Sequence, residues 1–319
     1  MNKSVFIIPH FGAFKNYFQL FLDSCSNKKY FDFIIFTDNK TNYSYPENFT
    51  VHYMSFDKLV ELVKGKFEFD ISLTRPYKLC DLKPMYGYIF SDYIRDYKYW
   101  GYCDSDLIFG DLDNILTPIV NQDYDKIFFL GHCALIKNSP ELITLFKMPL
   151  NGKELYKEVL LDFGNRSFDE EFTNSINNIF LEYDKTVYLN ELEANIYMKS
   201  SNFYLTRYNH RRHCYEIDKK RRLFTYQNGH IFSYSLDKQI QLLKKDEYLY
   251  IHMQSREMDI RIYNSSSYKI IPNAFEELEY DLVESTNFNN IKLKNFNLHY
   301  FSLRSKNLFT KIKRLIKRN

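Results

Sequence analysis

YWGYCDSDLIFG, residues 99–110, places two aspartates, Asp104 and Asp106, at the end of a run of apolar residues. The run predicts a buried strand, and the aspartates follow at its carboxyl end. Side chains two residues apart on an extended chain point to the same side, so both carboxylates can reach one ligand. Carboxylate oxygens suit Mg²⁺ or Mn²⁺, which proteins often hold together with substrate phosphates. The stretch therefore predicts a divalent-cation site, although an Asp-x-Asp pair is also common in solvated turns.

Strands and helices alternate around this stretch. Apolar runs predict buried strands at residues 4–8, 31–37, 49–54 and 126–130. Helical spacing of apolar residues predicts helices at 14–25, 56–63 and 83–96. This alternation predicts an α/β fold with a mostly parallel, Rossmann-type sheet flanked by helices. Ligands of such sheets bind beyond the carboxyl ends of the strands, which here are followed by Pro9–Gly12, Thr37–Asp38 and Asp104–Asp106.

The patterns beyond residue 150 are fewer. Residues 191–199 are expected to form a helix, and Asn-Gly at 228–229 between apolar runs predicts a hairpin. Residues 248–251 predict a strand that ends at His252. A histidine in this position can offer a neutral imidazole to a metal, and Arg256 can bind a diphosphate through two parallel hydrogen bonds.

A second polar group precedes the aspartates at the start of a predicted helix, where Lys78, Asp81 and Lys83 lie close together. Helix starts present free N–H groups and favour anions, so this group is a candidate for nucleotide binding. Asp81 can equally serve as a simple helix cap.

Length and composition indicate an ordinary globular protein, with 319 residues of which 45% are hydrophobic and 26% charged. No linker or internal repeat divides the chain, so one main domain with additions is expected. Five scattered cysteines without a CxxC pair predict neither a zinc site nor a disulfide framework. The apolar run before Pro9 is too short for a signal peptide or a membrane span. We therefore expect a cytoplasmic protein.

Charge is concentrated at the end of the chain. Residues 304–319 carry seven basic residues and no acid, so a net charge of +3 leaves −4 for the preceding 303 residues. This near-neutral body argues against nucleic-acid binding. On a helix, one apolar stripe is formed by Leu308, Phe309, Ile312, Leu315 and Ile316. A basic amphipathic helix of this kind is typical of peripheral binding to anionic lipid, here at the inner leaflet. A packed or frayed terminal helix is the alternative.

A basic stretch interrupts the body between residues 207 and 222. Its members are Arg207, His210, Arg211, Arg212, His213, Lys219, Lys220, Arg221 and Arg222. A solvated face is the favoured interpretation, and a binding surface for a phosphate-bearing acceptor is the alternative.

Seven segments occur together in a characteristic order. They are IPHFG (8–12), FTDN (36–39), YKLCDLKPMYGYIF (77–90), YWGYCDSDLIFGDL (99–112), GHCALIKN (131–138), FDEEF (168–172) and YIHMQSR (250–256). This set resembles a bacterial family of GT-A glycosyltransferases associated with capsule and other surface polysaccharides. The similarity covers roughly residues 4 to 260. It implies a GT-A-like catalytic domain at 1–260, a packed extension at 261–303 and the basic tail at 304–319.

The resemblance also implies a set of roles. Asp106 and His252 would bind Mn²⁺ or Mg²⁺, with Asp104 shared between the metal and a ribose. Pro9–Phe11 and Thr37–Asp38 would border the base of a nucleotide-sugar donor, with a UDP-sugar expected, while Lys78 and Asp81 would lie near the nucleotide. The implied activity is transfer of a hexose to a glycan or lipid-linked acceptor in surface polysaccharide synthesis.

The chemistry of transfer requires two further functions. Lys78 or Arg256 can stabilise the charge of the departing diphosphate, and Asp169 or Glu170 can act as a general base towards the acceptor hydroxyl. Acidic residues that open a helix near 168–180 would explain the same pair without catalysis.

Three other classes of protein share parts of this pattern. An aspartyl phosphatase carries its DxD motif after the first strand, and a pyrophosphorylase needs a Gly-rich, Arg-containing loop near the N-terminus. Neither feature is present in this sequence. A non-catalytic protein that binds glycans or nucleotide-sugars remains the alternative, because it could retain the same ligands.

Overall fold

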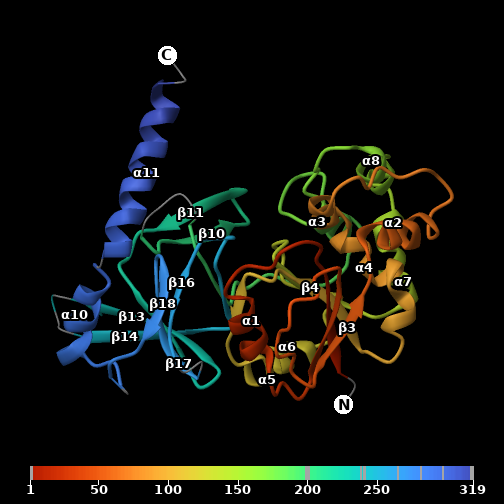
Figure 1. Cartoon of the computed structure of the whole chain (residues 1–319). Helices are drawn as coiled ribbons and strands as arrows, with labels where there is room; N and C mark the ends of the chain where they lie inside the picture. Colours follow the sequence, from red (N-terminus) through yellow and green to blue (C-terminus); the bar gives the residue numbers. More distant parts are fainter. Residues whose placement is uncertain are drawn as a thin grey trace. The chain divides into compact units, whose positions relative to one another are not determined.

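The computed structural model describes residues 3–197, 202–237, 239, 242–263, 266–280, 282–296 and 298–316 (Figure 1). The chain forms two compact units. Unit 1 comprises Met1–Phe14, Cys25–Ser105 and Leu112–Glu191. Unit 2 comprises Lys15–Ser24, Asp106–Asp111 and Leu192–Asn319. This geometric division differs from the boundaries at 260 and 303, and the functional roles expected for those three segments stay predictions.

Unit 1 is built on a mixed sheet of seven strands within the described residues. Their order is β3 (Phe49–Tyr53), β2 (Phe31–Thr37), β1 (Ser4–Pro9), β4 (Tyr99–Cys103), β7 (Cys133–Lys137), β6 (Lys126–Ile127) and β8 (Val187–Tyr188). The first four run parallel, whereas β7 is antiparallel to both neighbours. Strand β4 is buried at every position. The expected α/β class is therefore confirmed, and the strands at 31–37 and 99–103 have the predicted bounds.

Helices of unit 1 are short. They are α2 (Phe56–Lys64), η1 (Pro76–Lys78), α3 (Leu79–Leu82), η2 (Lys83–Met85), α4 (Tyr86–Ile89), η3 (Ser91–Tyr93), α5 (Leu112–Ile115), α6 (Thr117–Val120), α7 (Pro140–Thr144), η4 (Leu145–Lys147), α8 (Leu155–Leu161) and α9 (Ile176–Glu182). Helix α2 lies where expected, with the Ser55 hydroxyl accepting from the N–H of Lys58. One helix over 83–96 is wrong. The segment is divided into η2, α4 and η3 instead, and Phe90, with φ −103° and ψ 25°, interrupts the helical conformation between α4 and η3.

Unit 2 contains three sheets within the described residues. The largest has the order β14 (Leu242–Tyr248), β13 (His230–Asp237), β12 (Leu223–Gln227), β17 (Ser267–Ile271), β18 (Ala274–Glu277) and β16 (Asp259–Arg261). A second has the order β5 (Leu107–Phe109), β15 (Tyr250–His252) and β9 (Glu193–Asn195), and a third pairs β10 (Leu205–Asn209) with β11 (Cys214–Asp218). Its helices are α1 (Phe18–Cys25, of which Cys25 falls in unit 1), α10 (Ser285–Lys294) and α11 (Leu298–Ile316).

Unit 2 confirms one expectation and overturns another. The hairpin β12–β13 forms around Asn228 and Gly229, whose φ angles of 50° and 87° suit a tight hairpin turn. The helix expected over residues 191–199 is wrong, because Glu193–Asn195 pair in parallel with β15 instead. That pairing buries Ala194, and such tertiary contacts override a weak helical pattern. Residues 198 and 199 lie outside the described residues.

Among the described residues, no helix combines the length and the apolar character needed to cross a membrane.

Close packing of α4 on β4 gives a direct test of this fold. A Cβ at Gly87 would lie 2.2 Å from Cε2 of Trp100, whose side chain is fully buried. We expect Gly87→Ala to lower the free energy of unfolding by about 1–3 kcal/mol, because a packed core resists added volume. Gly65→Ala is the matched control, since φ at Gly65 is −64° and its Cβ would meet nothing closer than 3.5 Å. Urea unfolding of both variants is the measurement, and equal stability would contradict the packing described.

Candidate functional site

The loops after β1 and β2 meet at the carboxyl end of the sheet in unit 1. The Asp38 carboxylate accepts a hydrogen bond of 2.8 Å from the N–H of Gly12, whose φ of 98° favours glycine. Asn39 donates to the carbonyl of Gly12 at 3.0 Å. Asp38 is exposed, whereas Thr37 and Phe11 are buried. The predicted nucleotide-binding loops therefore lie together, with Asp38 the accessible acid among them.

Asp104, which follows β4, faces a buried cation. Nζ of Lys83 lies 2.7 Å from Oδ1 of Asp104 and 3.3 Å from Oδ2 of Asp169. The same ammonium donates to the carbonyl of Gly131 at 2.8 Å. Burial alone lowers the pKa of Lys83, but the charges of Asp104 and Asp169 outweigh it and hold this pKa well above its usual value. Lys83 is therefore a fixed positive charge at the end of β4.

The two candidate bases differ in their surroundings. Asp169 is buried, and burial raises its pKa to about 8, against the opposing charge of Lys83. Glu170 is half-buried and accepts a hydrogen bond of 3.1 Å from the N–H of Gly131. A Cβ at Gly131 would lie 2.6 Å from Oδ2 of Asp169, so only glycine permits this approach. Both acids precede α9, which begins only at Ile176, so the alternative explanation, in which they open a helix near 168, does not apply.

A second buried lysine supports the same loop. Lys126 donates to the carbonyl of Phe128 at 2.5 Å and to Oδ1 of Asn177 at 2.8 Å. Asn177 in turn donates to the carbonyls of Phe129 and Glu170, each at 2.8 Å. Burial lowers the pKa of Lys126 to about 7. The Lys126–Asn177 pair thus holds the backbone of Glu170 in place.

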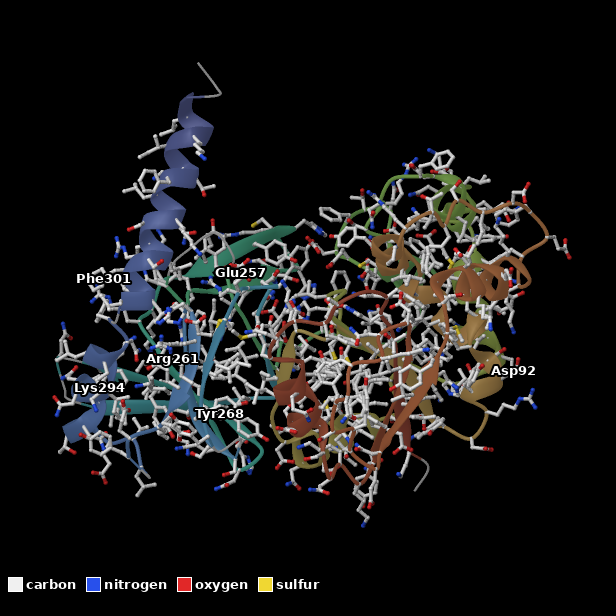
Figure 2. The ribbon with its side chains drawn as sticks, viewed as in Figure 1. Asp92, Glu257, Arg261, Tyr268, Lys294 and Phe301 are labelled. Carbon is white, nitrogen blue, oxygen red and sulfur yellow. The ribbon has the colours of Figure 1, made fainter. Side chains whose placement is uncertain are left out.

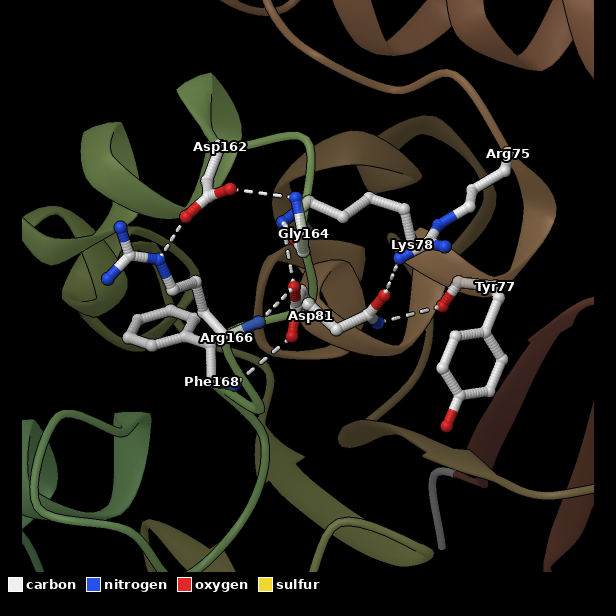
Figure 3. Close-up of polar contacts among 9 residues, drawn as sticks. Arg75, Tyr77, Lys78, Asp81, Asp162, Gly164, Arg166 and Phe168 are labelled. Carbon is white, nitrogen blue, oxygen red and sulfur yellow. Dashed lines mark hydrogen bonds and ion pairs between the residues drawn. The ribbon is translucent and has the colours of Figure 1, made fainter. Parts of the chain in front are cut away.

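Lys78 and Asp81 bind each other in the interior of unit 1 (Figure 3). Their charged atoms lie 2.8 Å apart, and both side chains are at most 1% exposed. Asp81 also accepts from the N–H groups of Arg166 at 2.8 Å and Phe168 at 3.4 Å, while Lys78 donates to the carbonyl of Gly164 at 2.5 Å. The pair therefore holds the 162–168 loop. Its expected contact with a nucleotide stays a prediction.

Asp106 and His252 are neighbours in unit 2: Asp106 directly precedes β5, and His252 ends β15, which is antiparallel to it. Leu107 pairs with His252, and Nε2 of His252 lies 3.5 Å from Oδ1 of Asp106. Both side chains are less than a tenth exposed. Burial opposes the charge on Asp106, but His252 and hydrogen bonds from Ser255 outweigh it and hold the pKa of Asp106 well below its usual value. Asp106 is therefore a buried carboxylate that stays ionised.

The turn after β15 is shaped around Asp106. The N–H of Ser255 donates to the Asp106 carboxylate, and the N–H of Met253 donates to its carbonyl at 3.1 Å. Gln254 and Ser255 adopt positive φ angles of 55° and 52°. Such conformations are uncommon for residues other than glycine and persist where surrounding contacts impose them, often at functional sites.

Gln254 lies next to the second nitrogen of His252. Its amide nitrogen is 3.3 Å from Nδ1 of His252 and donates to Oδ1 of Asn195 at 2.7 Å. For Nε2 to bind a cation, Nδ1 must carry the proton and find an acceptor. Rotating the two amides by 180° supplies one, because the Gln254 oxygen then faces Nδ1 and Asn195 becomes the donor. These two amides can therefore fix the ring in a metal-binding tautomer.

The three predicted metal ligands come together. Asp104, Asp106 and His252 each offer one ligand atom, and these atoms lie within 4.8 Å of one another. The proximity of the two carboxylates follows from their separation by a single residue. Two oxygens and an imidazole nitrogen are donors that Mn²⁺ and Mg²⁺ accept, so the residues present fit a divalent cation.

Arg256 is held by backbone oxygens in unit 2. It donates to the carbonyls of Pro272 and Tyr197, each at 3.2 Å, and its guanidinium lies 5.3 Å from the ring centre of Phe203. Burial lowers its pKa to about 10, which leaves it charged at neutral pH. Its expected role in binding a diphosphate stays a prediction.

The basic stretch at 207–222 falls on the β10–β11 hairpin and the segment after it. Arg211, Arg212 and His213 form the exposed turn, where Oδ1 of Asn209 accepts from the N–H groups of both arginines at 3.1 Å. Arg222 is buried and pairs with Asp218. The turn fits the solvated face expected from the sequence, and acceptor binding by it stays a prediction.

Fold and site together define an α/β protein with a candidate Asp-Asp-His metal centre. A family profile, described as a family of unknown function (DUF6625), matches residues 6–279. The chain therefore belongs to this family. Neither a curated protein nor a solved structure matches the sequence.

Sequence reasoning missed the residues that support the site. Lys126, Asn177 and Gly131 fix the Asp169–Glu170 loop, and Asn195 and Gln254 flank His252. Gly131 lies in the segment GHCALIKN and Gln254 in the segment YIHMQSR, so the segments that carry the family resemblance already contained both residues. Nothing in the local sequence indicated Lys126 or Asn177, because the two residues are 51 positions apart and meet only in the folded chain.

Asp81 tests whether the Lys78 pair is structural. We expect Asp81→Asn to lower the free energy of unfolding by about 3–5 kcal/mol, because it leaves a buried ammonium without its counter-charge. Asp162→Asn is the control in the same loop. Its pair with Arg166 is partly exposed, so we expect a much smaller loss than for Asp81→Asn. Thermal and urea unfolding are the measurements. A stable Asp81→Asn protein that has lost only ligand binding would contradict the structural role.

Metal binding tests the Asp-Asp-His group. We expect the full chain to bind Mn²⁺, and His252→Ala to abolish measurable binding. Gln254→Ala should weaken the affinity by about 10–100-fold, because the ring loses the partner that orients it. Gln122→Ala is the control, since Gln122 is exposed and its side-chain amide donates to the nearby Pro118 carbonyl. Titration of free Mn²⁺ by electron paramagnetic resonance is the measurement. Wild-type affinity in His252→Ala would remove that residue from the site.

Proposed function

We propose that this protein is a metal-dependent glycosyltransferase of GT-A type, which transfers a hexose from a nucleotide-sugar to a glycan or lipid-linked acceptor. The observation that carries the proposal is the convergence of Asp104, Asp106 and His252 on one potential cation position. The four parallel strands before these residues support it, because ligands of such sheets bind at the carboxyl ends. The resemblance of seven sequence segments to surface-polysaccharide glycosyltransferases supplies the reaction class.

Each residue has a separable task in this proposal. Asp106 and His252 bind the cation, and Asp104 shares it while pairing with Lys83. A bound divalent cation neutralises charge on the diphosphate leaving group. Asp38, exposed just after β2, is assigned to the base of the nucleotide. Arg256, which stays charged, is assigned to the phosphates.

Deprotonation of the acceptor is assigned to Asp169 or Glu170. A general base acts in its ionised form, and the pKa of Asp169 is raised to about 8 by burial. Turnover that depends on Asp169 must therefore rise as the pH increases through about 8, where the carboxylate becomes ionised. Glu170 is the more exposed of the two and lies on the same loop.

Hydrolysis of nucleotide-sugars tests the proposal. We expect the full chain, with Mn²⁺, to release nucleoside diphosphate from one member of a donor panel in which UDP-sugars are included. Chelation of the metal and Asp106→Ala should each abolish release. Binding of the donor without release or transfer would favour the alternative, a non-catalytic nucleotide-sugar or glycan-binding protein. No binding of any donor in the presence of Mn²⁺ would contradict both.

The same assay separates the candidate bases once an acceptor is known. If Asp169 is the base, Asp169→Asn should lower turnover by about 10²-fold or more with donor affinity little changed. Glu170→Gln should then keep both the activity and its rise with pH. The reverse result assigns Glu170, and full activity in both variants excludes this loop as the source of the base.

A further inference from the structure

Helix α11 (Leu298–Ile316) ends the described chain and is attached to unit 2 at its first turns. Tyr300 is buried, and its hydroxyl donates to Oδ1 of Asn202 at 3.3 Å. Arg304 donates to the same hydroxyl at 3.3 Å. From Arg304 onward, every side chain that the structure describes on this helix is exposed. Its last three turns therefore depend on something other than burial within unit 2.

One face of α11 is apolar and open to solvent. Its side chains are between 42% and 86% exposed, and they are Leu298, Phe301, Leu308, Phe309, Ile312 and Leu315. With 3.6 residues per turn, these positions fall within an arc of about 120°. Phe301 lies at the beginning of the helix, and Lys294 at the end of the preceding α10 (Figure 2). A globular protein normally buries an apolar stripe of this width.

The rest of the helix surface is cationic. Arg304, Lys306, Lys311 and Lys313 lie outside the apolar arc, and α11 contains no acidic residue. The sequence adds Arg314, Lys317 and Arg318. Lys317–Asn319 lie outside the described residues, as do the side chains of Arg314 and Ile316. The helix therefore combines an exposed apolar face with basic residues that no acidic residue on α11 offsets.

This combination restricts what can cover the face. A second copy of α11 would place cations opposite cations, which disfavours self-association. A phosphate-bearing polymer would explain the cations but not six exposed apolar side chains. An anionic lipid surface satisfies both, because apolar side chains enter the acyl boundary while lysine and arginine remain at the headgroups.

We propose that α11 lies in the plane of a membrane interface and attaches this protein to anionic lipid. The attachment is independent of glycosyl transfer, since none of the proposed metal ligands lies beyond His252. Because the cations are attracted to the lipid surface, binding is sensitive to salt. Because the apolar face is inserted, binding is also sensitive to replacement of Leu308 and Phe309 by polar residues.

Two tryptophan reporters on the full chain give the sharpest test. Trp100 is the single tryptophan and is fully buried, so it contributes a constant background. Phe309→Trp places a reporter on the apolar face, and Asn307→Trp places one about 160° away on the polar face. With vesicles of phosphatidylcholine and phosphatidylserine, we expect blue-shifted emission and quenching by brominated acyl chains for the first reporter only.

Vesicle co-sedimentation provides the independent measurement. We expect Leu308→Gln/Phe309→Gln to lower the partition coefficient by about tenfold or more, because two apolar side chains are lost from the inserted face. Asn307→Gln/Thr310→Gln is the matched control on the opposite face and should bind like the wild type. Unfolding curves verify that all variants fold. Raising the salt to 1 M should release the wild-type protein.

Specific outcomes would overturn the proposal. Equal binding to vesicles with and without phosphatidylserine would show that the cations do not recognise anionic lipid. Equal responses of the two reporters would show that the apolar face does not enter the membrane. A blue shift of Phe309→Trp without vesicles, with a dimer in sedimentation equilibrium, would assign the face to a second copy. Donor hydrolysis in solution is a separate readout, so failure of membrane binding leaves the glycosyltransferase proposal untouched.

Discussion

The buried ammonium of Lys83 is the charge around which Asp104 and Asp169 of unit 1 are arranged. A buried cation is tolerated only when it is paired and hydrogen-bonded, and Lys83 meets this condition through Asp104, Asp169 and the carbonyl of Gly131. These partners come from the end of β4, the 162–175 segment and the start of β7. One ion pair network therefore fixes the position of Asp104. In the proposed metal site, Asp104 would therefore share its carboxylate between the cation and Lys83.

The second constraint is the turn that follows His252. Asp106 accepts the N–H of Ser255, and Gln254 and Ser255 are held with positive φ angles as a result. Neither residue is a glycine, so the conformation costs free energy that the contacts with Asp106 must offset. The carboxylate thus lies beside the His252 ring and is also the acceptor that shapes the turn. Replacing it therefore disturbs both, which is why tests on Gln254 are cleaner than tests on Asp106.

The sequence predicts those parts of the molecule that local patterns determine. Continuous apolar runs sufficed for the strands at 31–37 and 99–103, and Asn228-Gly229 sufficed for the hairpin, because each signal is complete within a few residues. The Asp-x-Asp spacing, together with the resemblance that implied His252, named three residues whose potential ligand atoms do lie close together, and metal binding by them stays a prediction. Strand β9 could not be predicted, since Glu193–Asn195 become extended only by pairing with β15. The buried pairing of Lys78 with Asp81 was equally hidden, because burial depends on the 162–168 loop.

The energetics of the buried charges favour a chemical role for the cluster. The folded pKa of Asp169 is raised to about 8, above the unfolded value, so the native state binds more protons and its stability falls as the pH rises towards 8. Lys126 has the opposite sign, since its pKa is lowered to about 7 and stability increases as the pH rises from there towards the unfolded value. Near neutral pH, burial therefore favours the uncharged form of both groups, whereas in the unfolded chain both would be charged. Apolar side chains of similar volume often stabilise a fold at least as much as buried ion pairs do. A buried group that lowers stability near neutral pH is compatible with the proton transfer proposed for the Asp169–Glu170 loop, where the raised pKa of Asp169 would set its pH dependence.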